Sequence, residues 1–377
     1  MLAMSHTVRA NDAADAKRNS ARSGRINAFV DGLVSASPLS AAVMVVTMAI
    51  LLSLPAIIIT PGFMRDHGLQ FVPDDRNDFD AFSSVRAMQM QNYRGPEPII
   101  VIVGASTTRD ALASDHLSAA LASNGTRSAQ VFKLTGSNQS LWDSIAMLDA
   151  IPPGARGVAL IGVTPGSFTV NPERLRASAS QGRHAFRSHT YDDELQRMGI
   201  APARRYGIYL FDNLKFFLAR SHAIARNIMH GGAPSYSERI VGRATSVPPS
   251  RWREVGEYLS TRFRSYDDNR HYGEAALERA LARLTTSTGI IPVVVEAPVN
   301  PRFVTEFNQL ALFQRHAERM RNSAAKHGLR VINLNDLVDM QAADFFDWGH
   351  LSNEIIVKRC SQAVAAAIAD LLSQPES

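Results

Sequence analysis

The sequence has little cysteine and lacks the residue spacings of the common metal and nucleotide sites. Its 377 residues contain a single cysteine, Cys360, so the chain forms no intramolecular disulfide in either redox compartment. It contains no zinc-ligand spacing, no glycine-rich phosphate-binding loop and no dinucleotide fingerprint. His116, His316 and His327 are scattered on predicted helix faces, where we expect solvated side chains. We therefore expect neither a metal nor another cofactor.

Basic residues interleaved with aromatic ones are also missing. Aromatic residues make up 7% of the chain, and the formal net charge is a modest +5. Such a charge suits an anionic surface or polymer as a partner. Without a basic and aromatic motif, we expect no nucleic acid partner.

Charge is absent from one long segment, Leu39 to Ile59. It holds 21 residues, of which only Ser40, Thr47 and Ser53 are polar. A helix of this length just crosses the ~30 Å hydrocarbon core of a bilayer. A buried core helix normally keeps a polar stripe, and a signal peptide has a shorter apolar run followed by a small-residue cleavage site. Over both alternatives we favour an uncleaved transmembrane anchor at residues 38–60.

Flanking charge predicts the orientation of this anchor. The residues before it carry more basic than acidic side chains, namely Arg9, Lys17, Arg18, Arg22 and Arg25 against Asp12, Asp15 and Asp31. After it, Arg65 adds little basic excess. By the positive-inside rule, residues 1–37 form a cytoplasmic tail. We expect a single-pass protein of the inner (cytoplasmic) membrane, bound through residues 39–59, with its large domain periplasmic or extracellular.

From residue 96 onward, apolar runs alternate with helical periodicity. Strands are predicted at 98–103, 131–134, 157–163, 290–295 and 329–334, and helices at about 140–150, 274–286, 304–327 and 353–372. This alternation predicts an α/β fold with a doubly wound parallel sheet of about five strands in a domain over 96–377. A polar connector with one helix precedes it at 61–95. Functional residues are then expected at the carboxyl ends of the strands.

An insertion at about 171–273 interrupts the alternation. It is rich in Arg and His and predicts one amphipathic helix from Tyr206 to about Met229. The apolar side of that helix would hold Ile208, Phe211, Leu214, Phe217, Leu218, Ile224 and Ile228. One interpretation is a helical cap packed on the sheet. The other is a lid or a surface that grips a polymer or partner, with Arg204, Arg205, Lys215, Arg220 and Arg226 facing outward.

Ser106 follows the first predicted strand, where a helix is predicted to begin. The turn Gly104-Ala105-Ser106-Thr107-Thr108-Arg109 would expose the Ser106 hydroxyl near backbone N–H groups at the helix start. A serine that attacks an ester needs this exposure and a nearby place for oxyanion charge. The plainer alternative is that Ser106 or Thr107 caps the helix.

Asp347 and His350 lie between the last predicted strand and the last helix. Their spacing in Asp347-Trp348-Gly349-His350 lets the carboxylate hydrogen-bond the imidazole and leaves the other ring nitrogen for a serine. The alternative is an exposed pair that begins a helix. Because Ser106 is expected at the same edge of the sheet, we favour a catalytic arrangement.

These motifs resemble those of the SGNH (GDSL-like) serine hydrolases and acyltransferases. The block Gly104-Ala105-Ser106-Thr107-Thr108 resembles their Gly-Asp-Ser-x-Thr, with Ala105 in place of Asp, and Asp347 and His350 match their Asp-x-x-His. The resemblance covers about residues 96–170 and 286–372. It implies that Ser106 is the nucleophile, that His350 is the general base and then acid, and that Asp347 orients His350.

The resemblance also implies where the oxyanion hole lies and which donor is missing from it. The backbone of Ser106 and of Gly136 would donate to the oxyanion, but Gly162-Val163-Thr164-Pro165-Gly166 replaces the family's Gly-x-Asn-Asp. Losing such a donor typically costs roughly 2.7–4 kcal/mol of transition-state stabilisation. Asn138, Thr164 or a main-chain N–H would have to replace it.

The departures from the family pattern and the predicted anchor resemble the membrane-bound acyltransferase branch, which includes the teichoic acid D-alanine transfer protein and the alginate O-acetyltransferase families. This implies that Ser106 receives an acyl group, expected to be acetyl, from a membrane-embedded protein and passes it to an envelope polysaccharide. The insertion would act as a lid that excludes water. A simple carboxylesterase or lipase is one alternative, and a non-catalytic assembly or polymer-binding protein is another.

Three further residues are candidates for binding substrate. Arg109 follows the serine motif, and Glu296 and Asn300 follow the fourth predicted strand. For Glu296 and Asn300, anchoring of the loop is an equal alternative.

Overall fold

The structure, a computed structural model, describes residues 37–72, 78–125, 128–179, 182–230, 238–240 and 246–372. It divides into two units, Met1–Ile58 and Ile59–Ser377. The described part of the first unit is helix α2 (Pro38–Ile58) with the residue before it. Within the described part of the chain, α2 alone is long and apolar enough to cross a membrane. The predicted tail, with the charges used to orient the anchor, lies outside the described residues.

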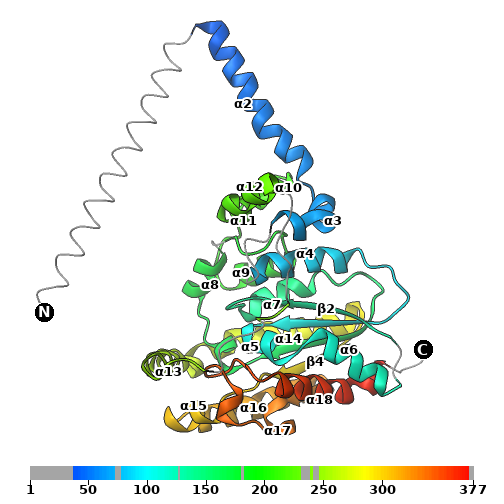
Figure 1. The fold of residues 1–377 in the computed structure, drawn as a ribbon, viewed down its shortest axis with the longest axis vertical. Coiled ribbons are helices and arrows are strands. Elements are labelled where there is room, and N and C mark those ends of the chain that lie inside the picture. Colours follow the sequence, from blue (N-terminus) through cyan, green and yellow to red (C-terminus); the bar gives the residue numbers. More distant parts are fainter. Residues whose placement is uncertain are drawn as a thin grey trace, which may run out of the picture. The chain divides into compact units, whose positions relative to one another are not determined.

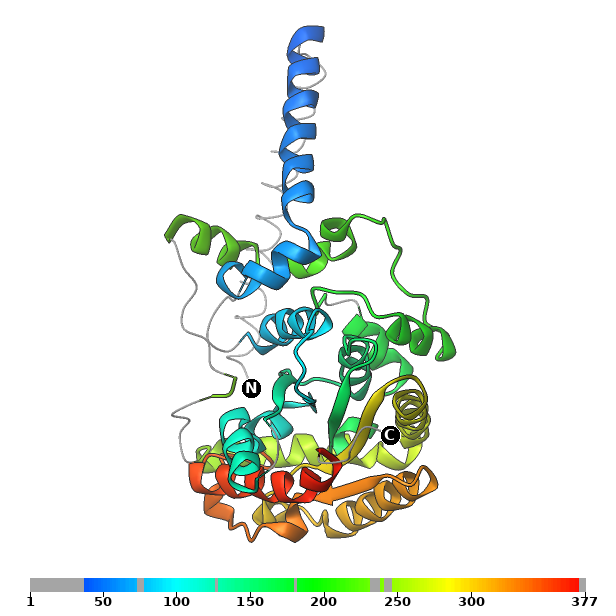
Figure 2. The same cartoon turned by 90° about the vertical axis from the view of Figure 1, so that its right-hand side faces the viewer.

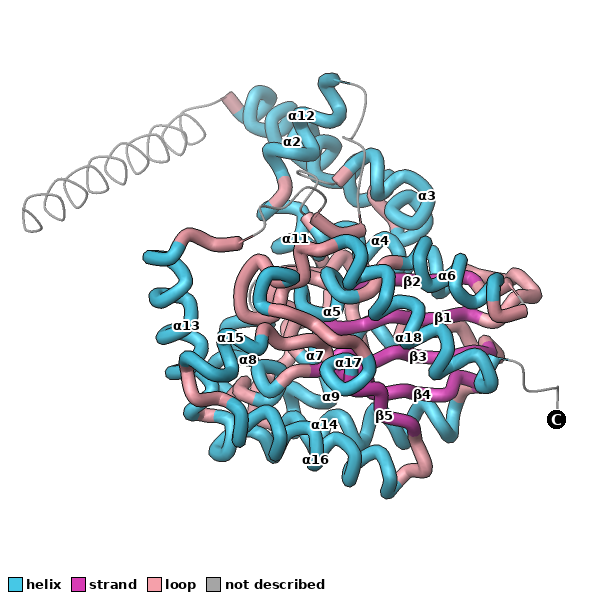
Figure 3. The backbone as a smooth tube through the Cα atoms, turned by 60° about the horizontal axis from the view of Figure 1, so that its bottom comes forward, coloured by secondary structure: helices cyan, strands magenta, loops and turns pink. Residues whose placement is uncertain are grey.

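Five parallel strands form the sheet of the second unit (Figures 1 and 3). They are β1 (Ile99–Gly104), β2 (Gln130–Thr135), β3 (Arg156–Val163), β4 (Gly289–Glu296) and β5 (Arg330–Asn333), in the order β2-β1-β3-β4-β5. Each strand agrees with its predicted range to within one residue at either end. The prediction of an α/β fold with a parallel sheet of about five strands is therefore confirmed.

Helices cover both faces of this sheet, which explains why β1 is apolar along its whole length and why β3 and β4 are apolar between their end residues. One core contains Val101 and Val103 of β1 with α7 (Leu141–Leu148), α14 (Tyr266–Ser287) and α16 (Leu310–Lys326). The other core contains the alternate residues Ile100 and Ile102 with α6 (Ser114–Ser123) and α18 (Glu354–Leu372). Figure 2 shows α18, in red, beside α6, against which it packs. The strand order changes direction at β1, and ligands of open α/β sheets commonly bind beyond the carboxyl ends of the strands at such a point.

The segment over 61–95 forms two helices where one was expected. They are α3 (Pro61–Phe71) and α4 (Phe79–Gln91). Each has a side-chain cap, because Phe63 N donates to Thr60 Oγ1 at 3.1 Å and Ala81 N donates to Asp78 Oδ1 at 3.0 Å. Since α4 packs against β2 and α3 packs against α4, this segment belongs to the fold of the second unit. Residues 73–77 of the predicted connector are not among the described ones.

The prediction of one helix over 206–229 is wrong. The described part of the insertion forms α8 (Pro172–Ala179), α9 (His189–Arg197), α10 (Tyr209–Asp212), α11 (Leu214–Ala219), α12 (Ser221–His230) and α13 (Pro249–Arg264), and α14 begins at its end. Asn213 and Arg220 leave the helical conformation. The Asn213 side chain bonds the Tyr209 carbonyl at 2.9 Å, a local bond of the kind that competes with a regular helix.

Side chains of this segment also face other directions than expected. Leu218 and Ile228, predicted to pack inward, are 62% and 66% exposed. Arg220, predicted to face outward, points inward and pairs with Asp78 at 2.7 and 3.0 Å. A prediction from helical periodicity takes the apolar side of a helix as the buried side. It cannot detect an ion pair between residues so far apart in sequence.

The remaining short helices lie at the ends of strands. They are α5 (Ser106–Ala111), α15 (Pro301–Glu306), α17 (Leu334–Leu337) and the 3₁₀ turns η1 (Pro165–Phe168) and η2 (Ala342–Asp344). The helix predicted over 304–327 is divided into α15 and α16 around Asn308, whose φ of 52° no helix accommodates.

Candidate active site

Two glycines let α5 begin directly after β1. Gly104 has φ 153°, and a Cβ on it would lie 2.6 Å from Thr108 Oγ1. A Cβ on Gly162, at the end of the neighbouring strand β3, would lie 2.0 Å from the same atom. Only residues without a side chain therefore allow Thr108 to pack over the strand ends. This turn places Ser106 at the first position of α5, at the carboxyl edge of the sheet.

A closed turn positions Asp347 and His350. Phe345 and Leu351 form an antiparallel bridge, and Phe346 N donates to His350 O at 2.8 Å. Within the turn, Asp347 Oδ1 accepts from the backbone of His350 at 3.0 Å. The turn can approach α5 because of Gly349, where a Cβ would lie 3.0 Å from the Thr107 side chain.

The structure brings Ser106, His350 and Asp347 into one hydrogen-bond chain. Ser106 Oγ lies 2.7 Å from His350 Nε2, and His350 Nδ1 lies 2.7 and 2.8 Å from the two carboxylate oxygens of Asp347. An ionised carboxylate can only accept, so Nδ1 carries the imidazole proton and Nε2 is left to accept from the serine hydroxyl. The contacts predicted from the sequence are present, and they have the geometry of a serine nucleophile with its base.

The surroundings of Asp347 keep its carboxylate ionised. Burial by itself raises its pKa, but the hydrogen bond and charge of His350, and then the backbone N–H groups of Gly349 and His350, outweigh burial. The pKa of Asp347 therefore lies below its ordinary value. A carboxylate that stays charged can stabilise an imidazolium.

Asn300 anchors the turn that carries Asp347. Its side chain is 2% exposed and donates to the Asp347 carbonyl at 3.0 Å, and its backbone N–H donates to Trp348 O at 2.8 Å. Its Oδ1 accepts from Arg302 N at 2.9 Å. These contacts use both the nitrogen and the oxygen of the side-chain amide within the protein. Of the two interpretations open from the sequence, loop anchoring is the one that matches them.

Arg109 is also occupied within the protein. Its guanidinium is buried, bonds Asp110 Oδ1 at 2.8 Å and Ser137 Oγ at 3.1 Å, and lies 3.9 Å from the centre of the Phe79 ring. The proposed contact of Arg109 with substrate therefore has no support in its surroundings.

Glu296 is a buried carboxyl at the end of β4. It is 5% exposed, and its Oε1 has no hydrogen-bond partner within the described part of the chain. Burial is the main cause that raises its pKa to about 7, with Arg321 opposing and Asp336 adding to the rise. Glu296 does not line the cleft above Ser106, so the predicted contact with substrate has no support here either.

The raised pKa of Glu296 predicts a pH-dependent stability. The folded protein holds this proton more tightly than the unfolded chain, whose carboxyl titrates near 4.5, so stability should fall as the pH rises from 4.5 through 7. Glu296→Gln should remove this dependence and raise the free energy of unfolding at pH 8 by about 3 kcal/mol. Urea unfolding of the detergent-solubilised chain at pH 5 and pH 8 measures the effect. Glu257→Gln, at an exposed position of α13, is the control and should not alter the dependence.

A cleft of about 1000 Å³ opens above Ser106. Ser106, His350, Asn138 and Thr164 all line it. Gly136 is buried and does not line it, and a Cβ on Gly136 would lie 2.4 Å from Asp80 Oδ1. Asn138 is exposed, with φ 52°. The Thr164 N–H is already used, since it donates to Ser167 Oγ at 3.2 Å. Asn138 and Thr164 are thus predicted replacement donors that line the cleft, and each has a side chain able to donate.

The insertion supplies the other wall of this cleft. Lining residues come from α8, α13 and the segments around Gly182 and Arg220. Arg183 bonds Asp80 at 2.9 and 3.0 Å and Asp143 at 3.2 Å, which ties the insertion to α4 and α7. Sequence reasoning noted that the insertion is rich in arginine, but not which arginines reach the cleft.

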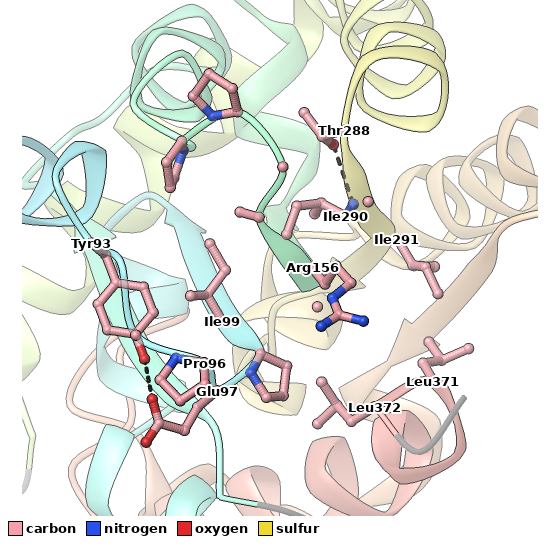
Figure 4. A pocket seen from close by; sticks show the side chains of 18 of the residues that line it. Tyr93, Pro96, Glu97, Ile99, Arg156, Thr288, Ile290, Ile291, Leu371 and Leu372 are labelled. Atoms are coloured by element: carbon pink, nitrogen blue, oxygen red, sulfur yellow. Dashed lines mark hydrogen bonds between the residues drawn. The ribbon is translucent and has the colours of Figure 1, made fainter. Parts of the chain in front are cut away.

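A second hollow of about 1060 Å³ lies at the opposite, amino edge of the sheet (Figure 4). Its lining includes Arg156 and Leu372, and Tyr93 OH donates to Glu97 at 2.5 Å beside it. None of the predicted site residues, all of which are described, lines this hollow.

The expectation that His316 is solvated is wrong. The side chain is 1% exposed, and its Nδ1 lies 3.0 Å from the hydroxyl of Tyr266. Burial lowers its pKa to about 3, so this histidine is neutral. His116 differs, because it bonds Glu354 at 2.8 Å near the surface, and His327 is half-buried. Among the described residues, no three His, Cys, Asp or Glu side chains are grouped to hold a metal ion.

No family model matches the sequence, and no curated protein matches it significantly.

Proposed function

We propose that this chain is a membrane-anchored SGNH-type serine acyltransferase that forms an acyl-serine at Ser106 and exchanges O-acyl groups with a cell-envelope polysaccharide. Its helix α2 anchors it in the cytoplasmic membrane, with the N-terminus cytoplasmic and the catalytic unit outside. A membrane-embedded protein supplies the acyl group, which is acetyl. The observation that carries the proposal is the hydrogen-bond chain from Ser106 through His350 to Asp347, at 2.7 Å per contact.

The first half-reaction forms the acyl-enzyme. Ser106 Oγ attacks the carbonyl carbon of the donor while its proton passes to His350 Nε2, and Asp347 stabilises the resulting imidazolium. The tetrahedral intermediate collapses as the donor's alkoxide or thiolate leaves with the proton from His350. The oxyanion takes hydrogen bonds from backbone N–H groups at the start of α5 and from the side chain of Asn138 or Thr164.

The second half-reaction transfers the acyl group to the polymer. A sugar hydroxyl gives its proton to His350 Nε2 and attacks the acyl carbon, and Ser106 Oγ recovers a proton as it leaves. A cleft of about 1000 Å³ has room for a sugar chain beside Ser106, and the insertion that lines it limits the access of water. A tether at the bilayer raises the effective concentration of a membrane-bound donor, an advantage that a freely diffusing esterase does not need.

Kinetics with a small donor test the transfer step. With 4-nitrophenyl acetate, the solubilised full chain should release about one nitrophenolate per enzyme in a burst and then hydrolyse slowly, until an envelope polysaccharide accelerates turnover. Ser106→Ala should remove the burst, whereas Ser123→Ala, at the end of α6 and outside the cleft, should keep it. Rapid multiple turnover that no acceptor changes would instead identify a simple esterase. A folded chain without a burst would favour a non-catalytic polymer-binding protein.

A further inference from the structure

Four arginines line the cleft above Ser106, and two of them have their charge neutralised. Arg183 pairs with Asp80 and Asp143, and Arg220 pairs with Asp78. The other two, Arg174 of α8 and Arg262 of α13, form no ion pair with any carboxylate that the structure describes. The cleft therefore carries an excess of positive charge on the wall contributed by the insertion.

Arg262 is held in place by neutral groups alone. Its Nε donates to Thr169 Oγ1 at 3.0 Å and its Nη2 donates to Gly166 O at 3.1 Å, so Nη1 keeps its donors for a ligand. Burial is the main cause that lowers the pKa of Arg262; Tyr258 opposes this fall, and the nearby charge of Arg174 adds a smaller lowering effect. Two cations close enough to repel each other, one of them half-buried, cost stability that an anion between them would recover.

Both arginines line the same cleft as Ser106. Arg262 bonds η1, the turn that directly follows Thr164, and Thr164 and Ser106 line the same cleft. Arg262 is therefore fixed by the segment that directly follows Thr164, one of the two candidate side-chain donors to the oxyanion. Arg174 is exposed on α8 and reaches the cleft from the insertion, with no hydrogen bond from its guanidinium to any described residue.

We infer that Arg174 and Arg262 form a subsite for an anionic group, a carboxylate or a phosphate, on the sugar chain that accepts the acyl group. This inference rests on the proposed function for the identity of the ligand as the acceptor. Guanidinium groups bind both kinds of anion through paired, charge-assisted hydrogen bonds. A neutral polysaccharide would leave both cations uncompensated in the cleft. The enzyme therefore selects an acidic polymer, and the acylated hydroxyl lies on or beside the sugar that carries the anion.

Direct binding tests the subsite independently of catalysis. Isothermal titration of the solubilised full chain would use three probes: tetragalacturonic acid for the carboxylate, a glycerol phosphate oligomer for the phosphate, and maltotetraose as the neutral chain. We expect one of the anionic probes to bind, with an affinity that falls as salt rises, and maltotetraose to bind at least tenfold more weakly. Arg174→Gln and Arg262→Gln should each lower the affinity for the anionic probe by about tenfold or more.

Matched control variants distinguish the loss of a subsite arginine from the loss of any positive charge on the same helix. Arg176→Gln on α8 and Arg264→Gln on α13 remove the same charge from the same helices at positions outside the cleft, and both should bind the anionic probe as the native chain does. Circular dichroism and thermal unfolding would show that each variant is folded. Equal binding of neutral and anionic chains, or equal loss in the control variants, would overturn the inference.

The two proposals fail in different experiments. If the native chain shows no burst with 4-nitrophenyl acetate but binds the anionic probe through Arg174 and Arg262, the anionic subsite stands and the acyltransferase proposal fails. If the burst occurs but neither anionic probe binds better than maltotetraose, the acyltransferase proposal stands and the subsite is refuted.

Discussion

His350→Ala is expected to lower the rate of acyl-enzyme formation by about 10⁴-fold or more. His350 Nε2 lies 2.7 Å from Ser106 Oγ, and no other described side chain donates to or accepts from that hydroxyl. Without the imidazole, the serine must lose its proton to water, and the leaving group receives none. Single-turnover release of nitrophenolate measures the loss, because it isolates the step before acceptor binding.

A second histidine provides the control for this substitution. His222→Ala changes an exposed histidine of α12 that does not line the cleft, so the rate should stay at the native level. If His350→Ala folds and still forms the acyl-enzyme at close to the native rate, His350 is not the general base, and the contact with Ser106 has another purpose.

Asp347→Asn is expected to have a similarly large effect, a fall in kcat of about 10⁴-fold with little change in the backbone of the turn. The amide can donate to His350 Nδ1, and this favours the tautomer that carries its proton on Nε2. In that tautomer Nε2 cannot accept the proton of the Ser106 hydroxyl. The amide also lacks the charge that stabilises the imidazolium. Asp193→Asn, at an exposed position of α9, should keep native kcat.

The same substitution should change the stability of the protein in acid. The pKa of Asp347 is depressed in the folded protein, so its contribution to stability is present above its ordinary value of 3.8 and is lost as the pH falls through the folded value. Asp347→Asn should lack this contribution and therefore lose less stability between neutral and acidic pH. Urea unfolding at pH 7 and pH 3 compares the two chains. Native kcat in the folded Asp347→Asn chain would contradict the role of the carboxylate.

The regular parts of the fold could be predicted because they depend on local pattern. The central strands β1, β3 and β4 are runs of mostly apolar residues buried on both faces, and such runs indicate both the strand positions and the α/β class. The breaks at Asn213 and Asn308 could not be predicted from apolar periodicity, because each arises at a single residue. The Asn213 side chain bonds the Tyr209 carbonyl, and Asn308 has a positive φ. The exposed Leu218 and Ile228 show the same limit, since periodicity reports which residues share a side and not what covers it.

The candidate site divides in a similar way. Ser106, Asp347 and His350 could be found because each lies in a short motif: Ser106 directly follows β1, and Asp347 and His350 lie between β5 and α18. Other residues of the site region depend on contacts between distant parts of the chain. Asn300 holds the Asp347 turn across 47 positions, and Arg262 reaches η1 across 96 positions. No local spacing signals such contacts, so the sequence left Asn300 with two interpretations and did not single out Arg262.

Labelling with a fluorophosphonate probe tests most directly whether this site is a serine nucleophile with its base. The probe should form one covalent adduct on the solubilised full chain, and peptide mass spectrometry should locate it at Ser106. His350→Ala and Ser106→Ala should abolish the adduct, and His222→Ala should keep it. A folded native chain that forms no adduct at Ser106 would contradict the proposed enzyme.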